Sequence, residues 1–323
     1  MTDGTKKAGC CAPSVESKGT LAPSAPDFTE NQQRELPDLS HRMVSLSGGT
    51  FLMGSDSSEV FPLDGEGPVR SVSLKPFHMD IHPVTNGSFA EFVNATGYET
   101  EAERYGWSFV FWGNIPEDKL ETLVEDTVPG ATWWCKVLGS SWQHPEGPGS
   151  SIAARKDYPV VHISWNDAQA YCAWSGLRLP TEAEWEFAAR GGLVQKAYPW
   201  GDRLRHEGKH MCNIWQGNFP VKDTGDDGYT ATCPVEAFPP NGFGLYSMTG
   251  NTWEWCADWF DTIYHAHSSL DDPKGPPTGI AKVIRGGSYL CHRSYCNRYR
   301  VAARTSSPLD SSTSNMGFRC ARS

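Results

Sequence analysis

The sequence lacks the features that mark membrane proteins and nucleic-acid-binding proteins. Nowhere in its 323 residues do apolar residues form the run of about 20 that a membrane span requires. The N-terminal stretch carries charge but no apolar run, so we expect no secretory signal and a cytoplasmic location. The 28 Lys and Arg are outnumbered by 38 Asp and Glu, and the net charge of −10 offers no electrostatic footprint for duplex nucleic acid.

Motifs of common enzyme classes are also missing. The sequence contains no Gly-x-Ser-x-Gly elbow, no phosphate-binding loop, no dinucleotide fingerprint and no His-Glu-x-x-His pair. It also shows no internal repeat at the usual periods. These absences weigh against an ordinary hydrolase, kinase or dehydrogenase and against a repeat architecture.

Aromatic residues, glycine and proline are abundant. Aromatic residues make up 12% of the chain and include 13 Trp, beside 32 Gly and 23 Pro. This composition argues against a helical bundle and favours a loop-rich fold whose core is built largely from aromatic side chains. Residues 1–40 are rich in Ser, Pro, Thr, Lys and Glu, so we expect a flexible tail there and one domain over residues 41–323.

A few short elements can be predicted from turn residues and capping residues. Two strands are expected at residues 43–46 and 50–54, on either side of a Ser-Gly-Gly turn. Three helices are expected at residues 85–97, 164–175 and 181–190, each beginning at a Thr or Ser that can cap it.

Two cysteines, Cys291 and Cys296, lie in the middle of a strongly cationic segment. Between Asp272 and Asp310 there is no acidic residue and the local charge is +7. The seven cations are Lys274, Lys282, Arg285, Arg293, Arg298, Arg300 and Arg304. Nearby positive charge stabilises the thiolate, which is the form of cysteine that attacks electrophiles and binds metals.

The spacing of this cysteine pair leaves four interpretations open. The pair could be two buried structural thiols. A dithiol oxidoreductase usually has Cys-x-x-Cys early in a βαβ unit, which is missing here. Structural zinc would need four ligands, and His292 could add only one. Two thiolates with few other ligands suit a soft monovalent ion, most commonly Cu(I).

Two further segments are rich in oxygen donors. The first runs from Asn213 to Tyr229 and contains an acidic, Gly-rich stretch that departs from the EF-hand pattern. It could hold a hard cation or be a solvated acidic turn. The second is residues 250–255, where Asn251 and Glu254 could supply oxygens, or where core aromatics could simply carry a polar cap.

From about residue 41 to the C-terminus, the chain resembles the formylglycine-generating (sulfatase-modifying factor) family. The matching motifs are residues 48–54 (GGTFLMG), 178–186 (RLPTEAEWE), 199–201 (PWG), 250–255 (GNTWEW), 285–288 (RGGS) and 315–320 (NMGFRC). Residues 287–296 (GSYLCHRSYC) resemble the active site of true formylglycine-generating enzymes. The resemblance implies an α+β fold with little regular secondary structure, in a single loop-rich domain of the C-type-lectin-like type.

The resemblance also implies a reaction, in which a cysteine within a Cys-x-Pro-x-Arg segment of a sulfatase is oxidised to Cα-formylglycine with O2 and Cu(I). By position, Cys291 and Cys296 would be the copper ligands. The reacting pocket would be lined by Ser288, Tyr295 and Trp253, and the substrate peptide would be held by His292, Arg304 and Asn315. The same superfamily contains non-catalytic peptide- or glycan-binding modules and small-thiol sulfoxide synthases, although the latter normally need an added helical domain that is missing here.

Calcium and disulfide positions follow from the same resemblance. One calcium site would use Asn213, Ile214, Asp227 and Tyr229, and a second would use Ser247, Gly250, Thr252 and Glu254. Secreted relatives have two disulfides, and the positions of one of them are occupied here by Ala189 and Val301, as expected for a reducing compartment. Cys172 and Cys320 stand at the other pair of positions and are predicted to touch. The remaining cysteines of the domain, Cys135, Cys212, Cys233 and Cys256, are expected to be buried apolar side chains, and we expect a monomer.

Overall fold

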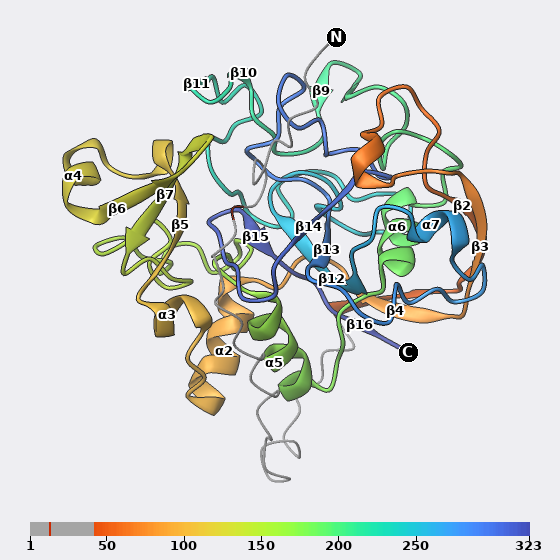
Figure 1. The fold of residues 1–323 in the computed structure, drawn as a ribbon, viewed down its shortest axis with the longest axis horizontal. Helices are drawn as coiled ribbons and strands as arrows, with labels where there is room; N and C mark the ends of the chain where they lie inside the picture. The colour runs from red at the N-terminus through yellow and green to blue at the C-terminus, as the bar shows by residue number, and fades with distance from the viewer. Residues whose placement is uncertain (1–12, 14–41) are drawn as a thin grey trace.

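The computed structural model describes Pro13 and residues 42–323. The predicted tail, including its two cysteines, therefore lies outside the described residues except for Pro13. The described chain is a mixed α and β structure made of many short strands, a few short helices and long connecting loops (Figure 1). This agrees with the loop-rich α+β fold expected from the sequence.

A four-stranded sheet lies at the centre of the molecule and carries parts of three of the motifs (Figure 1). Its strand order is β14-β13-β12-β15, with β12 and β15 parallel and the other pairs antiparallel. The strands are β12 (Trp253–Trp259), β13 (Lys282–Arg285), β14 (Arg304–Ser307) and β15 (Met316–Gly317). Residues 286–303, called the cysteine segment below because they contain Cys291 and Cys296, connect β13 to β14. This sheet therefore holds both ends of the segment.

Two smaller sheets contain the predicted N-terminal strands. The first is β1 (Met43–Leu46), β4 (Phe77–Asp80) and β16 (Ala321–Arg322), in the order β1-β4-β16. The second is β2 (Gly49–Met53) paired with β3 (Arg70–Leu74). Both predicted strands are therefore confirmed, but they belong to different sheets. Because β1 and β16 both pair with β4, the beginning and the end of the domain lie together.

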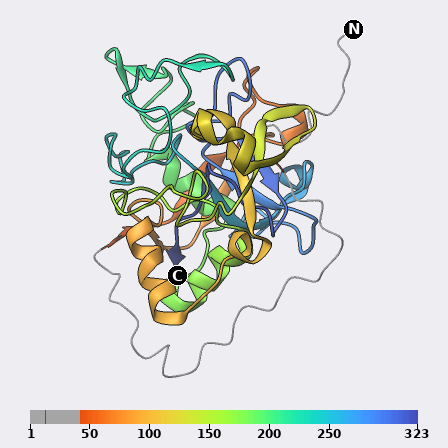
Figure 2. The same cartoon turned by 90° about the vertical axis from the view of Figure 1, so that its left-hand side faces the viewer.

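The three predicted helices are confirmed, together with their caps. They are α2 (Asn86–Thr96), α5 (Trp165–Ser175) and α6 (Glu182–Arg190). Each N-cap hydroxyl accepts a hydrogen bond from the backbone N–H three residues later, and each helix ends at a glycine in the left-handed conformation. Helices α2 and α5 lie side by side in both ribbon views (Figures 1 and 2). No helix in the described part of the chain is long and apolar enough to cross a membrane.

A further three-stranded sheet projects from one side of the molecule and supplies part of the site. It has the order β5-β7-β6, with β5 (Trp107–Phe111), β6 (Val124–Val128) and β7 (Ala131–Leu138). Short helical segments accompany it: α3 (Glu101–Tyr105), η3 (Trp112–Asn114), η4 (Glu117–Lys119) and α4 (Leu120–Leu123). Figure 1 shows this unit at the left of the view.

Aromatic rings form much of the core, as the composition predicted. In the largest buried cluster, Phe89 packs edge-on against Trp142 at a centroid distance of 5.2 Å. Tyr171 packs edge-on against Phe318 at 5.3 Å, which joins α5 to the chain end. Such pairs contribute about 0.5–1.5 kcal/mol each beyond the area they bury.

The remaining short elements lie within the connecting loops. These are η2 (Pro62–Asp64), β8 (Arg205–His206), β9 (Lys209–His210), β10 (Gly217–Asn218), β11 (Lys222–Asp223) and α7 (Tyr264–His267). Strands β10 and β11 form a two-residue hairpin ladder whose connecting turn contributes Phe219 to the site described below.

Candidate active site

The cysteine segment begins with a tight turn after β13. Gly286 and Gly287 both have positive φ, and a Cβ at position 287 would lie 2.9 Å from the carbonyl oxygen of Arg298. The chain then folds on itself, because the Cys291 N–H donates to the Ser288 carbonyl at 2.9 Å. The Cys296 N–H donates to the carbonyl of His292 at 3.0 Å. These turns bring the two cysteine side chains to one place.

Both cysteines line a small cavity. Its volume is about 10 Å³, close to that of one water-sized sphere. The lining residues are Trp133, Trp134, Phe219, Trp253, Ser288, Leu290, Cys291, Tyr295, Cys296 and Asn315. All five residues predicted to be catalytic are among them, together with Asn315, which was predicted to hold substrate. The lining residues come from β7, the turn between β10 and β11, β12, the cysteine segment and the approach to β15, which are distant in the sequence.

The two sulfur atoms face a largely apolar environment. Cys291 is 2% exposed and Cys296 is 1% exposed. The Ser288 N–H donates to Cys291 Sγ at 3.4 Å. Burial raises the pKa of Tyr299, and the nearby sulfurs of both cysteines add to the rise, which places both sulfurs near the same phenol. The sulfurs of Cys291 and Cys296 are therefore buried at one place in the structure.

This donor set fits a soft ion better than zinc. Within residues 42–323 and Pro13, no three His, Cys, Asp or Glu side chains gather in a way that could hold a metal ion. The four ligands of structural zinc are therefore missing from the described chain. Two sulfurs beside a cavity of ion size match the preference of Cu(I) for thiolates and leave coordination positions open.

Aromatic side chains form the wall of the cavity. Trp253 is fully buried, and its indole N–H meets no acceptor within the described part of the chain. Tyr295 stacks on Phe219 at a centroid distance of 4.2 Å, and Trp133 meets Tyr295 edge-on at 5.2 Å. These last three rings are partly exposed, so the wall they form is the accessible side of the cavity.

Polar contacts join the cavity to the segment before β15. Asn315 Nδ2 donates to Ser288 Oγ at 2.9 Å. Asn315 Oδ1 accepts a hydrogen bond of 2.6 Å from Thr313 Oγ1. The Leu290 N–H also donates to Ser288 Oγ, at 3.3 Å. These contacts fix the positions of Ser288 and Asn315 relative to the sulfurs.

The other two predicted substrate-binding residues lie outside the cavity lining. His292 is partly exposed, and its Nδ1 is 2.7 Å from Ser294 Oγ. Arg304 is only 1% exposed, and its guanidinium donates to both carboxylate oxygens of Glu182 at 2.6 and 2.8 Å. The structure does not bring Arg304 to this cavity, because β14 carries it into a buried ion-pair network instead.

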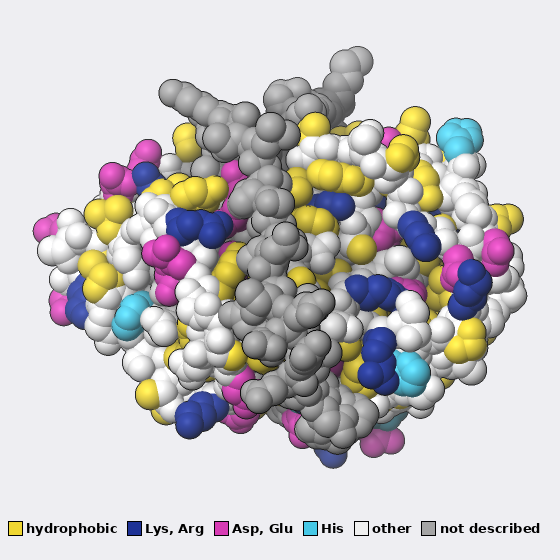
Figure 3. Space-filling view, turned by 90° about the horizontal axis from the view of Figure 1, so that it is seen from below, with side chains coloured by type: hydrophobic (Ala, Val, Ile, Leu, Met, Phe, Trp, Pro, Cys, Tyr) yellow, Lys and Arg dark blue, Asp and Glu magenta, His cyan; other side chains and the backbone are white. Residues whose placement is uncertain are grey.

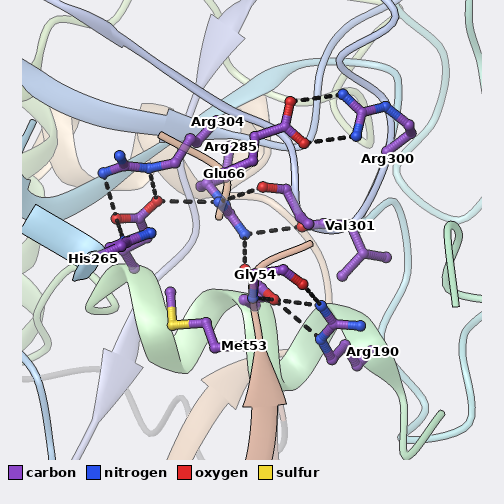
Figure 4. A network of polar contacts seen from close by, with 12 residues as sticks. Met53, Gly54, Glu66, Arg190, His265, Arg285, Arg300, Val301 and Arg304 are labelled. Carbon is purple, nitrogen blue, oxygen red and sulfur yellow. Dashed lines mark hydrogen bonds and ion pairs between the residues drawn. The ribbon is translucent and has the colours of Figure 1, made fainter. Parts of the chain in front are cut away.

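That network also corrects the expected role of the cationic segment. Arg285 pairs with Glu182 at 3.1 Å and with Glu186 at 2.6 Å, both from α6. Figure 4 shows the guanidinium groups of Arg285, Arg300 and Arg304 turned toward carboxylates. Burial alone would raise the pKa of Glu186, but the charges of Arg190 and Arg285 outweigh it and hold the pKa at about 2.

Two further arginines of the segment are neutralised by acidic residues from the η2 region. Arg298 Nε lies 2.6 Å from Asp64 Oδ2, and Arg300 Nη1 lies 2.6 Å from Glu66 Oε2. On the face seen in Figure 3, Lys and Arg side chains lie in small groups with Asp and Glu among them. The positive charge counted in the sequence is therefore largely paired with carboxylates and does not point at the cysteines.

The first predicted calcium set is brought together. Asp227 Oδ2 accepts a hydrogen bond from the Ile214 N–H at 3.0 Å, and Oδ1 accepts one from the Tyr229 N–H at 3.1 Å. Burial raises the pKa of Asp227. Burial also raises the pKa of Asp223, and the neighbouring carboxylates of Asp226 and Asp227 add to that rise. Two partly buried carboxylates, those of Asp223 and Asp227, therefore lie at this set, and oxygen is the type of ligand that a hard divalent cation takes.

The second predicted calcium set fits less well. The Glu254 carboxylate accepts hydrogen bonds from Arg319 at 2.7 and 2.8 Å and from Trp185 Nε1 at 2.7 Å. Arg319 Nη2 also reaches the Ser247 carbonyl at 3.4 Å. A guanidinium thus lies between two of the predicted ligands. Thr252 Oγ1 is buried and meets no partner in the described chain, so one oxygen remains available.

The predictions for the other cysteines are confirmed. Cys172 Sγ and Cys320 Sγ are 3.7 Å apart, which is a contact between thiols. Cys135, Cys212, Cys233 and Cys256 are all buried. Burial raises the pKa of Cys135 to about 11 and that of Cys233 to about 12, so these thiols stay neutral at ordinary pH.

Comparison with known proteins places these observations in a family. A family model described as the sulfatase-modifying factor enzyme 1-like domain matches residues 27–323. The formylglycine-generating enzyme of Thermomonospora curvata is 58% identical over 300 residues, which are 92% of this chain and 98% of that protein. The formylglycine-generating enzyme of Bos taurus is 53% identical over 280 residues, 87% of this chain and 74% of that protein. The structure of PvdO from Pseudomonas aeruginosa matches with a TM-score of 0.63 and 27% identity, covering 87% of this chain and 93% of that chain.

Proposed function

The chain belongs to the family of sulfatase-modifying factor enzyme 1-like domains, and we propose that it oxidises a cysteine of a sulfatase to Cα-formylglycine. The observation that carries the proposal is the cavity, which Cys291 and Cys296 line together with Ser288, Tyr295 and Trp253. The high identity to proteins named formylglycine-generating enzyme supports it. The substrate segment would be Cys-x-Pro-x-Arg, as the resemblance of residues 287–296 implies.

We propose that Cys291 and Cys296 hold Cu(I) through their sulfurs and that O2 is the electron acceptor. Bound Cu(I) would supply the redox chemistry between O2 and the substrate thiol. Conversion of the substrate cysteine to the aldehyde with release of hydrogen sulfide removes two electrons, whereas reduction of O2 to water takes four. Two further thiols, which leave as a disulfide, supply the other two electrons and complete the balance.

The residues of the cavity would bind the substrate cysteine and keep water away from it. The cavity has room for about one water-sized group, so the substrate thiol must enter on the accessible side formed by Trp133, Phe219 and Tyr295. Their rings would close over the thiol and exclude bulk water, which strengthens polar interactions inside. Ser288 and Asn315 supply the polar groups that face this space.

Calcium is proposed as a structural ion at the first set, Asn213, Ile214, Asp227 and Tyr229. The partly buried carboxylates there support it. At the second set, a calcium ion would have to share Glu254 with Arg319 or displace it. We also propose a cytoplasmic location, supported by Ala189 and Val301 at the positions of a disulfide in secreted relatives, and a monomeric state.

The test is conversion of a peptide that contains Cys-Thr-Pro-Ser-Arg. The purified protein is incubated with Cu(I), O2, a thiol reductant and the peptide, and the peptide mass is measured. We expect the mass loss from cysteine to formylglycine, abolished by Cys296→Ser and retained in Cys172→Ala, a matched change of a buried thiol outside the cavity. An unchanged peptide with copper loaded would overturn the proposal, and binding without turnover would point to a non-catalytic binding module.

A further inference from the structure

A line of hydrogen bonds runs from Thr313 through Asn315 to Ser288 and ends at the cavity. Thr313 Oγ1 donates to Asn315 Oδ1 at 2.6 Å, and Asn315 Nδ2 donates to Ser288 Oγ at 2.9 Å. All three side chains are buried, with at most 1% exposure. Thr313 does not line the cavity, and no prediction from the sequence gave it a role.

The donor-to-acceptor order of these hydrogen bonds determines where the Ser288 hydroxyl can donate its proton. Ser288 Oγ accepts hydrogen bonds from Asn315 Nδ2 and from the Leu290 N–H. A hydroxyl has two lone pairs and one proton, so these two bonds occupy its acceptor positions and leave the proton for another partner. Because Ser288 lines the cavity beside both sulfurs, that proton is available to a group bound there.

Thr313 stabilises this direction through the Asn315 amide. An amide can present either its oxygen or its nitrogen to a neighbour. Without the Thr313 hydroxyl, the hydrogen bond that it donates to Asn315 Oδ1 would be lost. The Ser288 hydroxyl could then satisfy that oxygen if the amide turned over, since the two residues are already in contact. This rotation of the amide would direct the Ser288 hydroxyl proton to Asn315 Oδ1 and away from the cavity.

Hydrogen bonds to two other segments hold the backbone at Thr313 and Ser314 in place. Its carbonyl accepts a hydrogen bond from the His162 N–H at 2.9 Å. The following residue, Ser314, donates its N–H to the Phe109 carbonyl in β5 at 2.9 Å. A β-branched side chain on a fixed backbone has few accessible rotamers, so the hydroxyl keeps its place.

We propose that Thr313 is a positioning residue that orients the Asn315 amide so that Ser288 donates its proton into the cavity. The recipient would be negative charge on sulfur or oxygen that develops there during the reaction, so this inference rests on the proposed function. A donor aimed at developing charge accelerates a reaction by stabilising its transition state. Thr313 would therefore affect turnover more than substrate binding.

The kinetic test compares Thr313→Val, which removes the hydroxyl, with Thr313→Ser, which keeps it. We expect kcat for the peptide to fall about tenfold in Thr313→Val, the loss expected for one charge-assisted hydrogen bond, with KM nearly unchanged. Thr313→Ser should restore most of the rate. In a Ser288→Ala background, Thr313→Val should have no further effect, because the coupling acts through the missing hydroxyl. Equal kcat in Thr313→Val and the parent protein, or additive effects in the double variant, would overturn the proposal.

A second readout needs neither copper nor turnover. The side-chain amide protons of Asn315 can be observed in ¹⁵N–¹H correlation spectra of the copper-free protein and assigned by their loss in Asn315→Asp. We expect this signal to move in Thr313→Val and to stay in place in Thr313→Ser; an unmoved signal in Thr313→Val contradicts the proposal. Should Thr313→Val fail to fold, Thr313→Ala removes the same donor without adding a methyl group. If the parent protein converts no peptide, the proposed function fails, whereas the amide signal still decides whether Thr313 orients Asn315.

Discussion

The segment between β13 and β14 contributes to two regions, a cavity lined by its cysteines and a set of ion pairs made by its arginines. The two regions differ in polarity and in charge. Cys291 and Cys296 face a small aromatic cavity whose lining contains no charged side chain. Arg298 and Arg300, a few residues later, turn away from it and pair with carboxylates from near η2. One region is apolar and carries the proposed chemistry, whereas the other is ionic and holds the segment to the rest of the domain.

The comparison explains how a loop with so little regular structure can be rigid. Residues 286–303 form no strand or helix of their own, so backbone ladders cannot hold them. Buried arginine–carboxylate pairs do this instead, and removal of one partner leaves the other charge buried and unpaired. The cysteines can then remain in neutral surroundings. Net positive charge in a sequence therefore need not be directed at the nearest thiol.

The largest expected effect comes from breaking the cavity. Cys291→Ala should lower the affinity for Cu(I) by orders of magnitude, because one of only two sulfur ligands is lost. The fold should survive, since the change removes a single buried sulfur. Affinity is measured by competition with a Cu(I) chelator, and thermal unfolding is followed in parallel. Cys172→Ala is the matched control, and Cu(I) binding that survives Cys291→Ala would refute the two-sulfur assignment.

The next effect comes from breaking the ionic region. Glu66→Ala should lower the free energy of unfolding by about 3–5 kcal/mol, because it leaves Arg300 buried without its carboxylate. Replacing both partners, as in Glu66→Ala with Arg300→Met, should recover part of this loss. Denaturant unfolding measures both variants. If the single change costs less than the double change, the pair does not hold the segment in the way we describe.

Acid should weaken the neighbouring ion pairs that Glu186 makes with Arg190 and Arg285. Glu186 has a pKa of about 2 in the folded protein, below its ordinary value of 4.5, because the charges of Arg190 and Arg285 outweigh the effect of burial. A lowered pKa stabilises the fold above the unfolded-state pKa, and this stabilisation is lost as pH falls from about 4.5 toward 2. The contribution is about 3 kcal/mol. The free energy of unfolding should fall less steeply with decreasing pH in Glu186→Gln than in the parent protein. An identical slope would contradict the assignment.

The smallest effect tests the proposed calcium site, which lies in neither region. Calcium at about 100 times its dissociation constant would stabilise the fold by about 2.7 kcal/mol if it binds only the folded chain. Added calcium should therefore raise the melting temperature of the parent protein and of Asp226→Asn, an exposed neighbour. The rise should be absent in Asp227→Asn. A rise of the same size in Asp227→Asn would exclude this site.

Local features of the fold could be predicted from the sequence because local residues determine them. The Thr and Ser caps and the terminal glycines gave the three helices, since a capping hydroxyl acts within its own first turn. The buried state of Cys135 and Cys256 followed from the ordinary behaviour of cysteine. The convergence of Ser288, Trp253 and Asn315 on the cysteines followed only from the family resemblance, because no local rule joins these segments.

Long-range pairings could not be predicted from the sequence. Arg298 and its partner Asp64 are separated by 234 positions, and no pattern in the sequence relates them. For the same reason, the charge of the segment suggested an electropositive cysteine site. The expected place of Arg304 at the substrate came from the family resemblance. The ring of Phe219 was missed because it reaches the cavity from a hairpin turn with no motif of its own.

The central claim is that two sulfurs in an uncharged cavity hold the reactive metal, and the coordination of copper tests it most directly. X-ray absorption at the copper edge of the Cu(I)-loaded protein should show Cys291 and Cys296 as two sulfur neighbours. Addition of the Cys-Thr-Pro-Ser-Arg peptide without O2 should add a third sulfur. Nitrogen or oxygen neighbours in the loaded protein, or a spectrum that the peptide leaves unchanged, would contradict the account.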